Sequence, residues 1–487
     1  MKKIGASLFM AGVLSAASAQ TNAPAVRPLS LSDCIAEAIQ HNFDVRIERY
    51  EPLIEQLALD AAYAGYDPTL SLSGTHSHNN TTGLLTTNGV SITENNSFNS
   101  GLGGALPSGA TYNLFGNMSD TYEPYPEIAG GQVGVNVTQP ILKNLWIDST
   151  RLGVTIAKIQ VKLSEQGLRQ QLITTVTAVE NAYYELIYAR ENVEVGRQAL
   201  DLAQTQLDQD RQRVEVGSLA PLDVQQDESQ AAQSEANLIL AVSTLGTDQR
   251  VLKTLITDEY TTWVDVDIQP TMTLDAPLQL FNLQDSWSKG MTQRPDLLQA
   301  RLNLEQQGIQ LKYDRNQLFP ELDLVGSFGY NGDGTGYSET LGQYGTANRP
   351  FYSYGAQVSV PLSNVKARSA YQSDKAIERQ DLLKLKQLEQ NIMVSIDNAV
   401  GVARSDYESV EATKLARIYA EAALDAEQKK YAVGKSTTFT VLQLQNSLTA
   451  ARSQEIRALA NYQEALTALA QQEGSTLERR KVDVTVK

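Results

Sequence analysis

The sequence contains two copies of one pattern, and this repeat limits the folds that the chain can adopt. Residues 43–74 align without a gap to residues 295–326. The matched positions include Asp44 and Asp296, Pro68 and Pro320, and Leu70 and Leu322. A second match pairs Val216-Gly217 with Val433-Gly434. Self-similarity on this scale indicates two structural units that pack beside each other. Each half predicts a long helix, then short strands, then further long helices.

The first residues have the order of features of a secretory signal peptide. Two lysines precede an apolar stretch at residues 4–14 and a small-residue cleavage site at residues 17–19. We therefore predict a signal peptide at residues 1–19 and a mature chain that crosses an inner membrane. The single cysteine, Cys34, lacks the apolar context that a lipoprotein signal requires, so we predict neither a lipid anchor nor a disulfide.

Composition excludes several classes of function. Beyond the signal peptide no apolar run approaches the roughly 20 residues of a membrane-spanning helix, so we expect any membrane insertion to use β-strands. The formal net charge of −16 argues against a nucleic-acid partner, and we interpret the acidic excess as solvated helix faces. Of three histidines, His76 and His78 share a strand face without a third ligand nearby, so we expect no metal site and no cofactor.

Heptad periodicity dominates the helical segments. One apolar row recurs every seventh residue at Leu172, Val179, Leu186, Val193, Leu200, Leu207 and Val214. A second row, three residues after each, is mostly small and consists of Thr175, Ala182, Ala189, Gly196, Ala203 and Asp210. The second half repeats the pattern loosely at Ile396, Ala403, Val410, Leu424 and Tyr431. Two such rows form one seam and predict left-handed coiled-coil packing. The pattern from about residue 146 to residue 216 predicts a helix of roughly 105 Å.

Each long helix is predicted to end in a tight hairpin tip. Gly217 and Gly434 supply the left-handed C-cap, and Pro221 suits the first turn of the following helix. Turn residues with capping side chains follow Gly434. Both halves therefore predict helical hairpins.

The segments between the helices predict short strands. Period-two alternation marks residues 69–76, 132–138, 321–330 and 355–360. Residues 101–118 indicate an added hairpin, which gives four strands in the first half and two in the second. Residues 78–97 and 331–348 are expected to connect strands. Weak alternation with aromatic residues near the strand ends is typical of a membrane β-barrel.

The predicted fold class is mainly α with a membrane β-barrel, built from two tandem repeats that assemble as a trimeric α/β-barrel channel. The expected parts are the signal peptide 1–19, a first repeat 20–256, an irregular equatorial connector 257–293, a second repeat 294–472 and a charged, loosely held tail 473–487. Four to six strands are too few to close a barrel, since the smallest bacterial barrels have about 8. Several copies must therefore contribute strands, and a ring of long helices leaves an aqueous tunnel.

The order of short motifs resembles the TolC family of outer-membrane efflux proteins over residues 29–469. The motifs are Tyr66-Asp67-Pro68, Thr138-Gln139-Pro140, Arg294-Pro295-Asp296-Leu297, Leu318-Phe319-Pro320 and Val360-Pro361-Leu362, together with the two Val-Gly tips. The resemblance implies a homotrimer with a barrel in the outer membrane of a Gram-negative-type cell and a tunnel through the periplasm. It further implies a periplasmic adaptor (membrane fusion) protein, an inner-membrane transporter of RND, ABC or MFS type, and export of drugs, metabolites or proteins.

The resemblance also implies a periplasmic gate at the hairpin tips. The positions that match the linking residues are Asp223 and Tyr431, whereas Ser436 stands where a basic residue is expected. Thr440 and Gln443 stand at the positions of an acidic ring, so a carboxylate ring is absent there. Asp227 or Glu228 could replace the missing carboxylates, with Lys430 or Lys435 as the cationic partner. It is at least equally consistent with the sequence that these four residues are ordinary solvated charges.

Two other classes of function are alternatives to an export channel. A secreted coiled-coil scaffold or adhesin explains the heptads and the signal peptide but not the strand segments that recur in both halves. An enzyme is set aside, because the sequence has no nucleophile–base pair, cysteine–histidine cluster or phosphate-binding glycine loop.

Overall fold

A computed structural model describes residues 25–81, 91–122 and 128–482. The predicted signal peptide lies outside these residues. Contacts divide the chain into two compact units. The first unit is formed by the described residues of 1–42, 178–276 and 409–463, and the second by those of 43–177, 277–408 and 464–487. Each unit therefore draws on both halves of the sequence.

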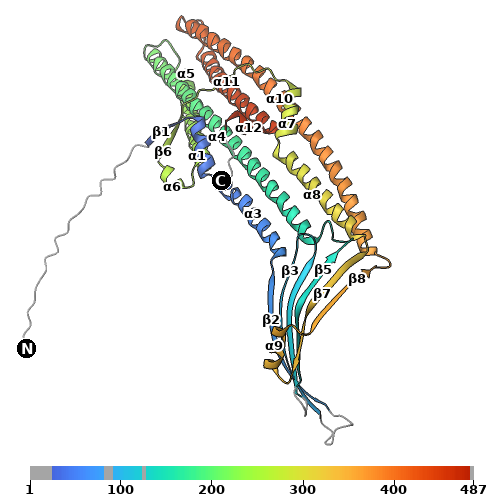
Figure 1. The fold of residues 1–487 in the computed structure, drawn as a ribbon. Helices are drawn as coiled ribbons and strands as arrows, with labels where there is room; N and C mark the ends of the chain where they lie inside the picture. Colours follow the sequence, from blue (N-terminus) through green and yellow to red (C-terminus); the bar gives the residue numbers. More distant parts are fainter. Residues whose placement is uncertain (1–24, 82–90, 123–127, 483–487) are drawn as a thin grey trace, which may run out of the picture. The chain divides into compact units, whose positions relative to one another are not determined.

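Figure 1 shows the elements in chain order. The helices are α1 (Leu31–His41), α2 (Phe43–Glu48), α3 (Tyr50–Tyr63), α4 (Ser149–Glu215), α5 (Pro221–Ile256), α6 (Tyr260–Trp263), α7 (Leu283–Gln293), α8 (Pro295–Gln317), α9 (Tyr337–Thr346), α10 (Val365–Ala432), α11 (Thr438–Glu473) and α12 (Thr476–Arg479). The strands are β1 (Ala25–Leu29), β2 (Thr69–Thr81), β3 (Ser91–Ala105), β4 (Thr111–Tyr122), β5 (Ile128–Pro140), β6 (Val266–Pro270), β7 (Glu321–Gly334) and β8 (Pro350–Ser359). No helix of the described ranges combines the length and apolar character needed to cross a membrane.

The first unit contains a small parallel sheet that the sequence did not predict. Strand β1 pairs with β6, in the segment expected to be an irregular connector. The buried Tyr183 hydroxyl of α4 donates to the Leu29 carbonyl at 3.0 Å and accepts the Thr271 amide at 3.2 Å. Arg190 of α4 also donates to the Ile268 carbonyl at 3.1 Å. The prediction of an irregular connector was therefore wrong for residues 266–270, because α4 side chains hold this stretch in an extended form.

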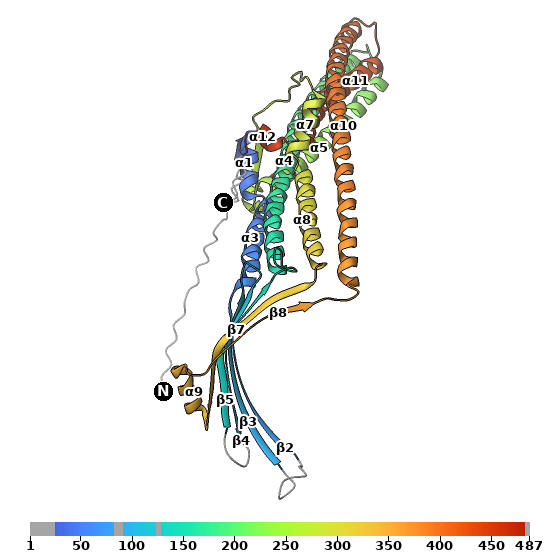
Figure 2. The same ribbon diagram turned by 45° about the vertical axis from the view of Figure 1, so that its right-hand side comes forward.

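The second unit contains a six-stranded antiparallel sheet in the order β2-β3-β4-β5-β7-β8. Figure 2 shows the strands side by side. The first half supplies four strands and the second half two, as the added hairpin predicted. Helix α9 packs on β7 and β5, where the sequence predicted only a connection between strands. The Thr340 hydroxyl donates to the Gly336 carbonyl at 3.1 Å, and its side chain is fully buried.

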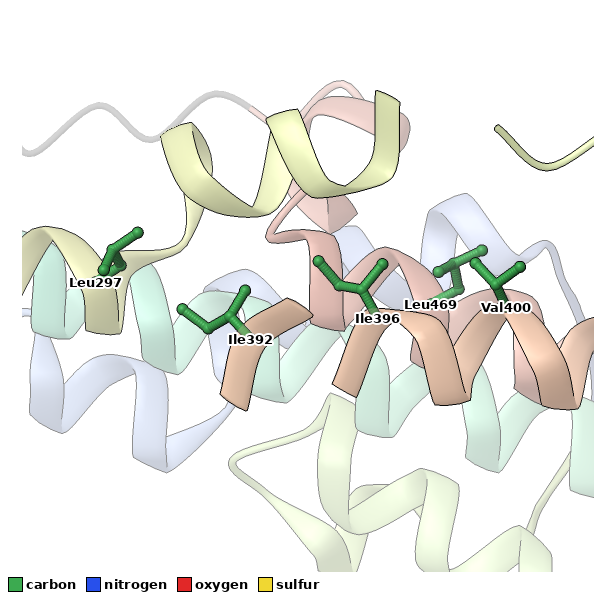
Figure 3. Packing of buried hydrophobic residues seen from close by; sticks show 5 residues of the cluster. All are labelled: Leu297, Ile392, Ile396, Val400 and Leu469. Carbon is green, nitrogen blue, oxygen red and sulfur yellow. The ribbon is translucent and has the colours of Figure 1, made fainter. Parts of the chain in front are cut away.

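The core of the second unit joins three long helices. Figure 3 shows the apolar side chains at its centre, which are Leu297 of α8, Ile392, Ile396 and Val400 of α10, and Leu469 of α11. Helix α7 covers this cluster with Trp287 and Met291, although the sequence predicted an irregular chain there. Gly290 of α7 lets the helices approach closely, because a Cβ there would displace the terminal methyl group of Ile396. Ridges formed by every fourth residue of a helix pack in this way.

The C-terminal segment is held more firmly than predicted. It forms α12, in which Thr476 and Leu477 are buried. The Arg479 guanidinium donates to the Leu466 carbonyl at 3.0 Å. The expectation of a loosely held tail was therefore wrong for residues 475–479, because an apolar side chain of α12 is buried against the unit.

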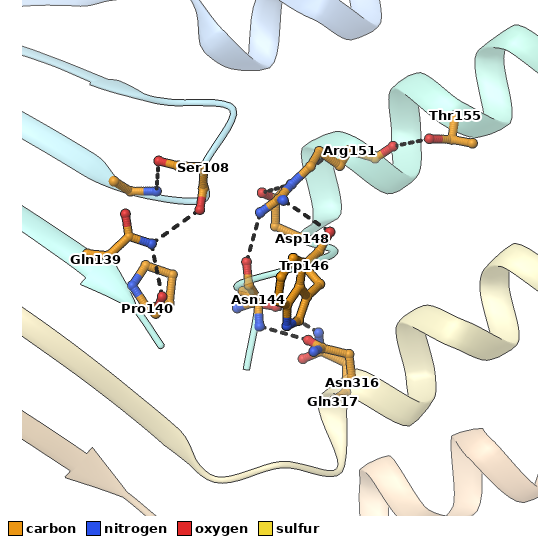
Figure 4. Close-up of polar contacts among 11 residues, drawn as sticks. Ser108, Gln139, Pro140, Asn144, Trp146, Asp148, Arg151, Thr155, Asn316 and Gln317 are labelled. Carbon is orange, nitrogen blue, oxygen red and sulfur yellow. Dashed lines mark hydrogen bonds and ion pairs between the residues drawn. The ribbon is translucent and has the colours of Figure 1, made fainter. Parts of the chain in front are cut away.

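The turn of the added hairpin is fixed to the base of the sheet, as Figure 4 shows. Gln139 donates to the Ser108 carbonyl at 3.2 Å. The Arg151 guanidinium of α4 donates to the Asn144 carbonyl at 3.0 Å, and the Asn144 amide donates to Asn316 of α8 at 2.7 Å. The first bond holds the hairpin turn against β5, and the other two join the start of α4 to the end of α8 through Asn144.

Candidate functional site

The helical hairpin tips hold the residues that the sequence marked as a gate, and all of them lie in the first unit. The first tip ends α4 with Gly217 at φ +73°. The Ser218 amide donates to the Arg213 carbonyl at 2.8 Å, and the Gly217 amide to the Val214 carbonyl at 2.9 Å. This pair of bonds is the Schellman motif, which requires a left-handed residue and therefore favours glycine. Pro221 then occupies the first turn of α5.

The second tip repeats this geometry at the end of α10. Gly434 has φ +75°, the Lys435 amide donates to the Lys430 carbonyl at 2.9 Å, and the Gly434 amide donates to the Tyr431 carbonyl at 3.0 Å. The Thr440 amide of α11 then donates to the Thr437 hydroxyl at 3.4 Å. The two halves of the repeat thus produce the same tip by the same hydrogen bonds.

Tyr431 joins the two hairpins, but its partner is not the residue that the resemblance named. Its hydroxyl donates to Asp210 Oδ2 of α4 at 2.7 Å and lies 2.9 Å from the Thr438 hydroxyl of α11. Burial raises the pKa of Tyr431, so the hydroxyl keeps the proton that it donates. Asp223 is half-buried on the first turn of α5, and its side chain makes no hydrogen bond or ion pair within the described ranges.

Asp210 is fully buried and receives further donors from its own helix. Gln206 donates to Oδ2 at 2.7 Å, and Arg213 lies 3.4 Å from Oδ1. The Arg213 guanidinium also lies over the Tyr431 ring, 4.5 Å from its centre. These groups form the tip cluster, which we define as Gln206, Asp210, Arg213, Asp227, Tyr431 and Thr438.

Asp227 of α5 is the other carboxyl of the tip cluster. Its side chain is fully buried, and neither oxygen has a hydrogen-bond donor within the described part of the chain. Burial and the adjacent Asp210 raise the pKa of Asp227 to about 7. Of the two cationic partners proposed for it, Lys430 pairs with Glu427 at 2.7 Å and Lys435 is exposed.

The remaining predicted positions lie around the second tip. The Ser436 hydroxyl donates to Glu427 at 2.6 Å, and hydrogen bonds from Lys430 and then Ser436 lower the pKa of Glu427. Lys435 and Gln443 are exposed, and Thr440 is half-buried with its hydroxyl 3.0 Å from that of Thr437.

A groove with a mixed polar and apolar lining runs along the same hairpins, between α5 and α11. Its volume is about 890 Å³, and its lining includes Leu222 and Gln226 of α5 and Phe439, Gln443 and Asn446 of α11. Gln230 and Asn446 exchange two hydrogen bonds, at 2.8 and 2.9 Å, across its floor. Exposed Leu222 and Phe439 leave apolar surface at its mouth.

The sequence did not single out Gln206, Arg213 or Thr438 as site residues, and it named Asp210 only as a member of the second heptad row. The heptad pattern nevertheless contained a signal from which the tip cluster could have been predicted. Asp210 interrupts a row of small residues, and Tyr431 occupies the seam of the other hairpin. Polar groups on facing seams must satisfy one another, since an unpartnered buried polar group is costly.

Comparison with known proteins gives a consistent result. The family described as "Outer membrane efflux protein" matches residues 116–257 and 288–475, which is more than half of the chain. The pyoverdine export outer membrane protein OpmQ of Pseudomonas aeruginosa is 24% identical over 308 residues, which are 61% of this chain and 60% of the relative. Outer membrane protein TolC of Escherichia coli is 25% identical over 300 residues, or 59% of each chain. The matched part therefore spans about three fifths of these relatives.

A solved structure resembles the fold over most of the chain. The outer membrane protein VceC of Vibrio cholerae superposes with a TM-score of 0.68 at 18% identity and covers 91% of this chain and 96% of that chain. At this identity the likeness establishes the fold alone. Together with the family match, it confirms the predicted mainly α fold with a β-sheet part and the resemblance drawn from the motifs.

Proposed function

Because the chain belongs to the outer membrane efflux protein family, we propose that it is an export channel through which small molecules or proteins leave the cell. The family is one of outer membrane proteins, so the chain is located in the outer membrane with a large periplasmic helical portion. The proposed role is that of a conduit without catalysis or cofactor. The relative OpmQ is named for pyoverdine export.

The observation that carries the proposal is a sheet with two open edges. Strands β2 and β8 each have one neighbour in the described sheet, so a row of backbone amides and carbonyls on each is unpaired. In lipid each unpaired group costs several kcal/mol. The alternating directions make β2 and β8 antiparallel to each other. The β8 edge of one copy therefore suits the β2 edge of the next, and pairing them closes a barrel.

The proposed assembly is a homotrimer. Three sheets of six strands supply about 18 strands, the size at which membrane barrels leave an aqueous channel. Leu70 and Leu72 of β2 and Tyr352 and Tyr354 of β8 are exposed in the single chain. Their placement supports contact with lipid or with a neighbouring copy.

Helices α2 and α3 also leave apolar surface for another copy. The side chains of Phe43, Ile47, Tyr50, Ile54 and Leu57 are each more than half exposed. They alternate in steps of four and three, which is the spacing of a coiled-coil seam without its partner. A second copy of this chain would cover such a seam.

The gate is proposed to lie at the hairpin tips, toward a periplasmic adaptor protein and an inner-membrane transporter of RND, ABC or MFS type. Its candidate residues remain Asp223, Asp227, Tyr431, Lys435, Ser436, Thr440 and Gln443, at tips shaped by Gly217, Pro221 and Gly434. The two repeats are proposed to span residues 20–256 and 294–472, with 257–293 between them and 473–487 as the tail.

A cross-linking experiment tests the closed assembly. In a single chain β2 and β8 are five strand spacings of about 4.8 Å apart, whereas a disulfide needs Cα atoms within about 7 Å. We would combine Cys34→Ser and Ser71→Cys with Ala356→Cys, Gln357→Cys or Val358→Cys in turn, to scan the register. One register should give covalent trimers in outer membranes on a non-reducing gel, and the matched single-cysteine variants should give none.

The outcome discriminates between the channel and the secreted scaffold. Oxidised trimers that still produce stepwise conductance in a planar lipid bilayer are the expected result. Monomers at every register, in a protein recovered from the soluble fraction, would contradict the proposal and favour the scaffold.

A further inference from the structure

All four helices of the hairpins contribute to the tip cluster through positions that face their neighbours. Asp210 continues the small-residue row of α4, and Tyr431 continues the apolar row of α10. On α5 the buried residues Asp227, Ser234 and Ala241 recur every seventh residue. A polar residue at such a seam sets the register of a coiled coil at a cost in stability.

Asp210 is the common acceptor of this cluster. It accepts from Tyr431 of the other hairpin at 2.7 Å and from Gln206 at 2.7 Å. Hydrogen bonds to an ionised acceptor are about twice as strong as neutral ones. The carboxylate of Asp210 thus connects the α4–α5 hairpin to the α10–α11 hairpin.

Asp227 faces Asp210 with no other partner. As two carboxylates, the side chains have no hydrogen to share and repel each other in a buried site. With one proton, the Asp227 hydroxyl donates to Asp210, and one negative charge remains for Tyr431 and Arg213. Burial, then Asp210, then Asp223 hold the pKa of Asp227 at about 7, so the proton is retained up to neutral pH.

We propose that Asp210 and Asp227 share one proton, and that loss of this proton weakens the link between the hairpins and opens the periplasmic end of the channel. The inference rests on the proposed function, since it assigns a control to the same gate. It replaces Asp223 by Asp210 as the partner of Tyr431, and it makes Asp227 the residue that titrates.

The charged groups around Asp227 determine the direction of the effect. From α4 it is faced by Asp210, and from its own helix α5 it is faced by Asp223. Arg213 of α4 lies 3.4 Å from Asp210. Helix α10 supplies Tyr431, and α11 supplies the uncharged Thr438. The nearby Glu228 is paired with Arg211 at 2.8 Å.

The closed state binds a proton more tightly than a solvated, opened state. The contribution of this proton to closure is therefore complete at acid pH, and it is lost progressively as pH rises to about 7. Between the ordinary Asp pKa of about 4 and about 7, the opening equilibrium constant should increase by up to about tenfold per pH unit, the limit for a single proton, and it should level off at higher pH.

The test is the conductance of the purified trimer in a planar lipid bilayer from about pH 5 to about pH 9. The wild-type open fraction should rise with pH and level off above about pH 7. In the Asp227→Asn variant, the side-chain amide can donate a hydrogen bond to Asp210 at every pH. The open fraction of this variant channel should therefore stay low and independent of pH. Asp208→Asn is the matched control, because it removes an exposed carboxylate two residues from Asp210 on the same helix, and it should titrate as wild type does.

A second measurement uses the wild-type protein and does not require a channel. The carboxylic acid band in infrared difference spectra should disappear near pH 7, and this change should be absent in Asp227→Asn. A wild-type spectrum without such a transition, or an Asp227→Asn conductance that titrates as wild type does, would overturn the shared proton. Failure of every variant to conduct while the infrared transition persists would instead contradict the export channel.

Discussion

The link between the hairpins predicts that removal of one hydroxyl, Tyr431→Phe, loosens both tips. The ring of Tyr431 is 7% exposed and packs with Leu424, Val441 and Leu448. Phenylalanine keeps that packing and the ring beneath Arg213. The substitution therefore isolates the hydroxyl that donates to Asp210 at 2.7 Å.

The size of the effect follows from the charge of the acceptor. A hydrogen bond to a charged group contributes about 1.5–3 kcal/mol. Asp210 is fully buried, so water cannot replace the lost donor without opening the cluster. The local opening equilibrium should therefore increase roughly 10- to 150-fold.

Hydrogen exchange at the second tip measures this opening. The Gly434 and Lys435 amides donate to the Tyr431 and Lys430 carbonyls, so their protection reports the last turn of α10. Tyr419→Phe, an exposed hydroxyl on the same helix, is the matched control. In a double-mutant cycle with Asp210→Asn, the two effects should not add. Equal exchange in Tyr431→Phe and Tyr419→Phe would refute the link.

Three further substitutions have defined outcomes. Gly217→Ala should cost about 1 kcal/mol, because φ is +73° while the added methyl meets open space; the Ser218 amide should exchange faster, and Gly217→Asn should recover part of the loss. Gly109→Ala should lower the thermal unfolding midpoint more than Gly217→Ala does. Residue 109 has a φ of +83°, and in addition its new Cβ would lie 2.7 Å from the Asn144 carbonyl oxygen. Burial and a neighbouring carboxyl raise the pKa of Asp314 to about 6, so the stability it contributes is present at acid pH and is lost as pH rises through about 6. Asp314→Asn should remove that part of the pH dependence in urea unfolding, and an unchanged profile would contradict the assignment.

Long-range periodicity made the helices and the tips predictable. A heptad row fixes which face of a helix is buried, and Gly217 and Gly434 adopt the positive φ that a helix C-cap requires. The added β-hairpin was also predictable from the sequence, because the turn residues 107–109 separate two strand-like segments. Local residue patterns were sufficient for these features.

Elements that depend on distant partners were not predictable. Strand β1 is extended because it pairs with β6. The Tyr183 hydroxyl of α4 also holds β1 by donating a hydrogen bond to the Leu29 carbonyl. Helix α9 forms in a segment rich in Gly, Ser and Thr because it packs on β5 and β7. Asp227 illustrates the same limit at the site, since its role depends on Asp210 of another helix.

The central claim is that several copies of this chain close one barrel from all six strands. Electron cryomicroscopy of the protein extracted from outer membranes tests it most directly. The account predicts threefold particles with a closed barrel of about 18 strands, in which β8 of one copy pairs with β2 of the next. Single chains with uncovered sheet edges, or a barrel from which β3 and β4 are excluded, would contradict it.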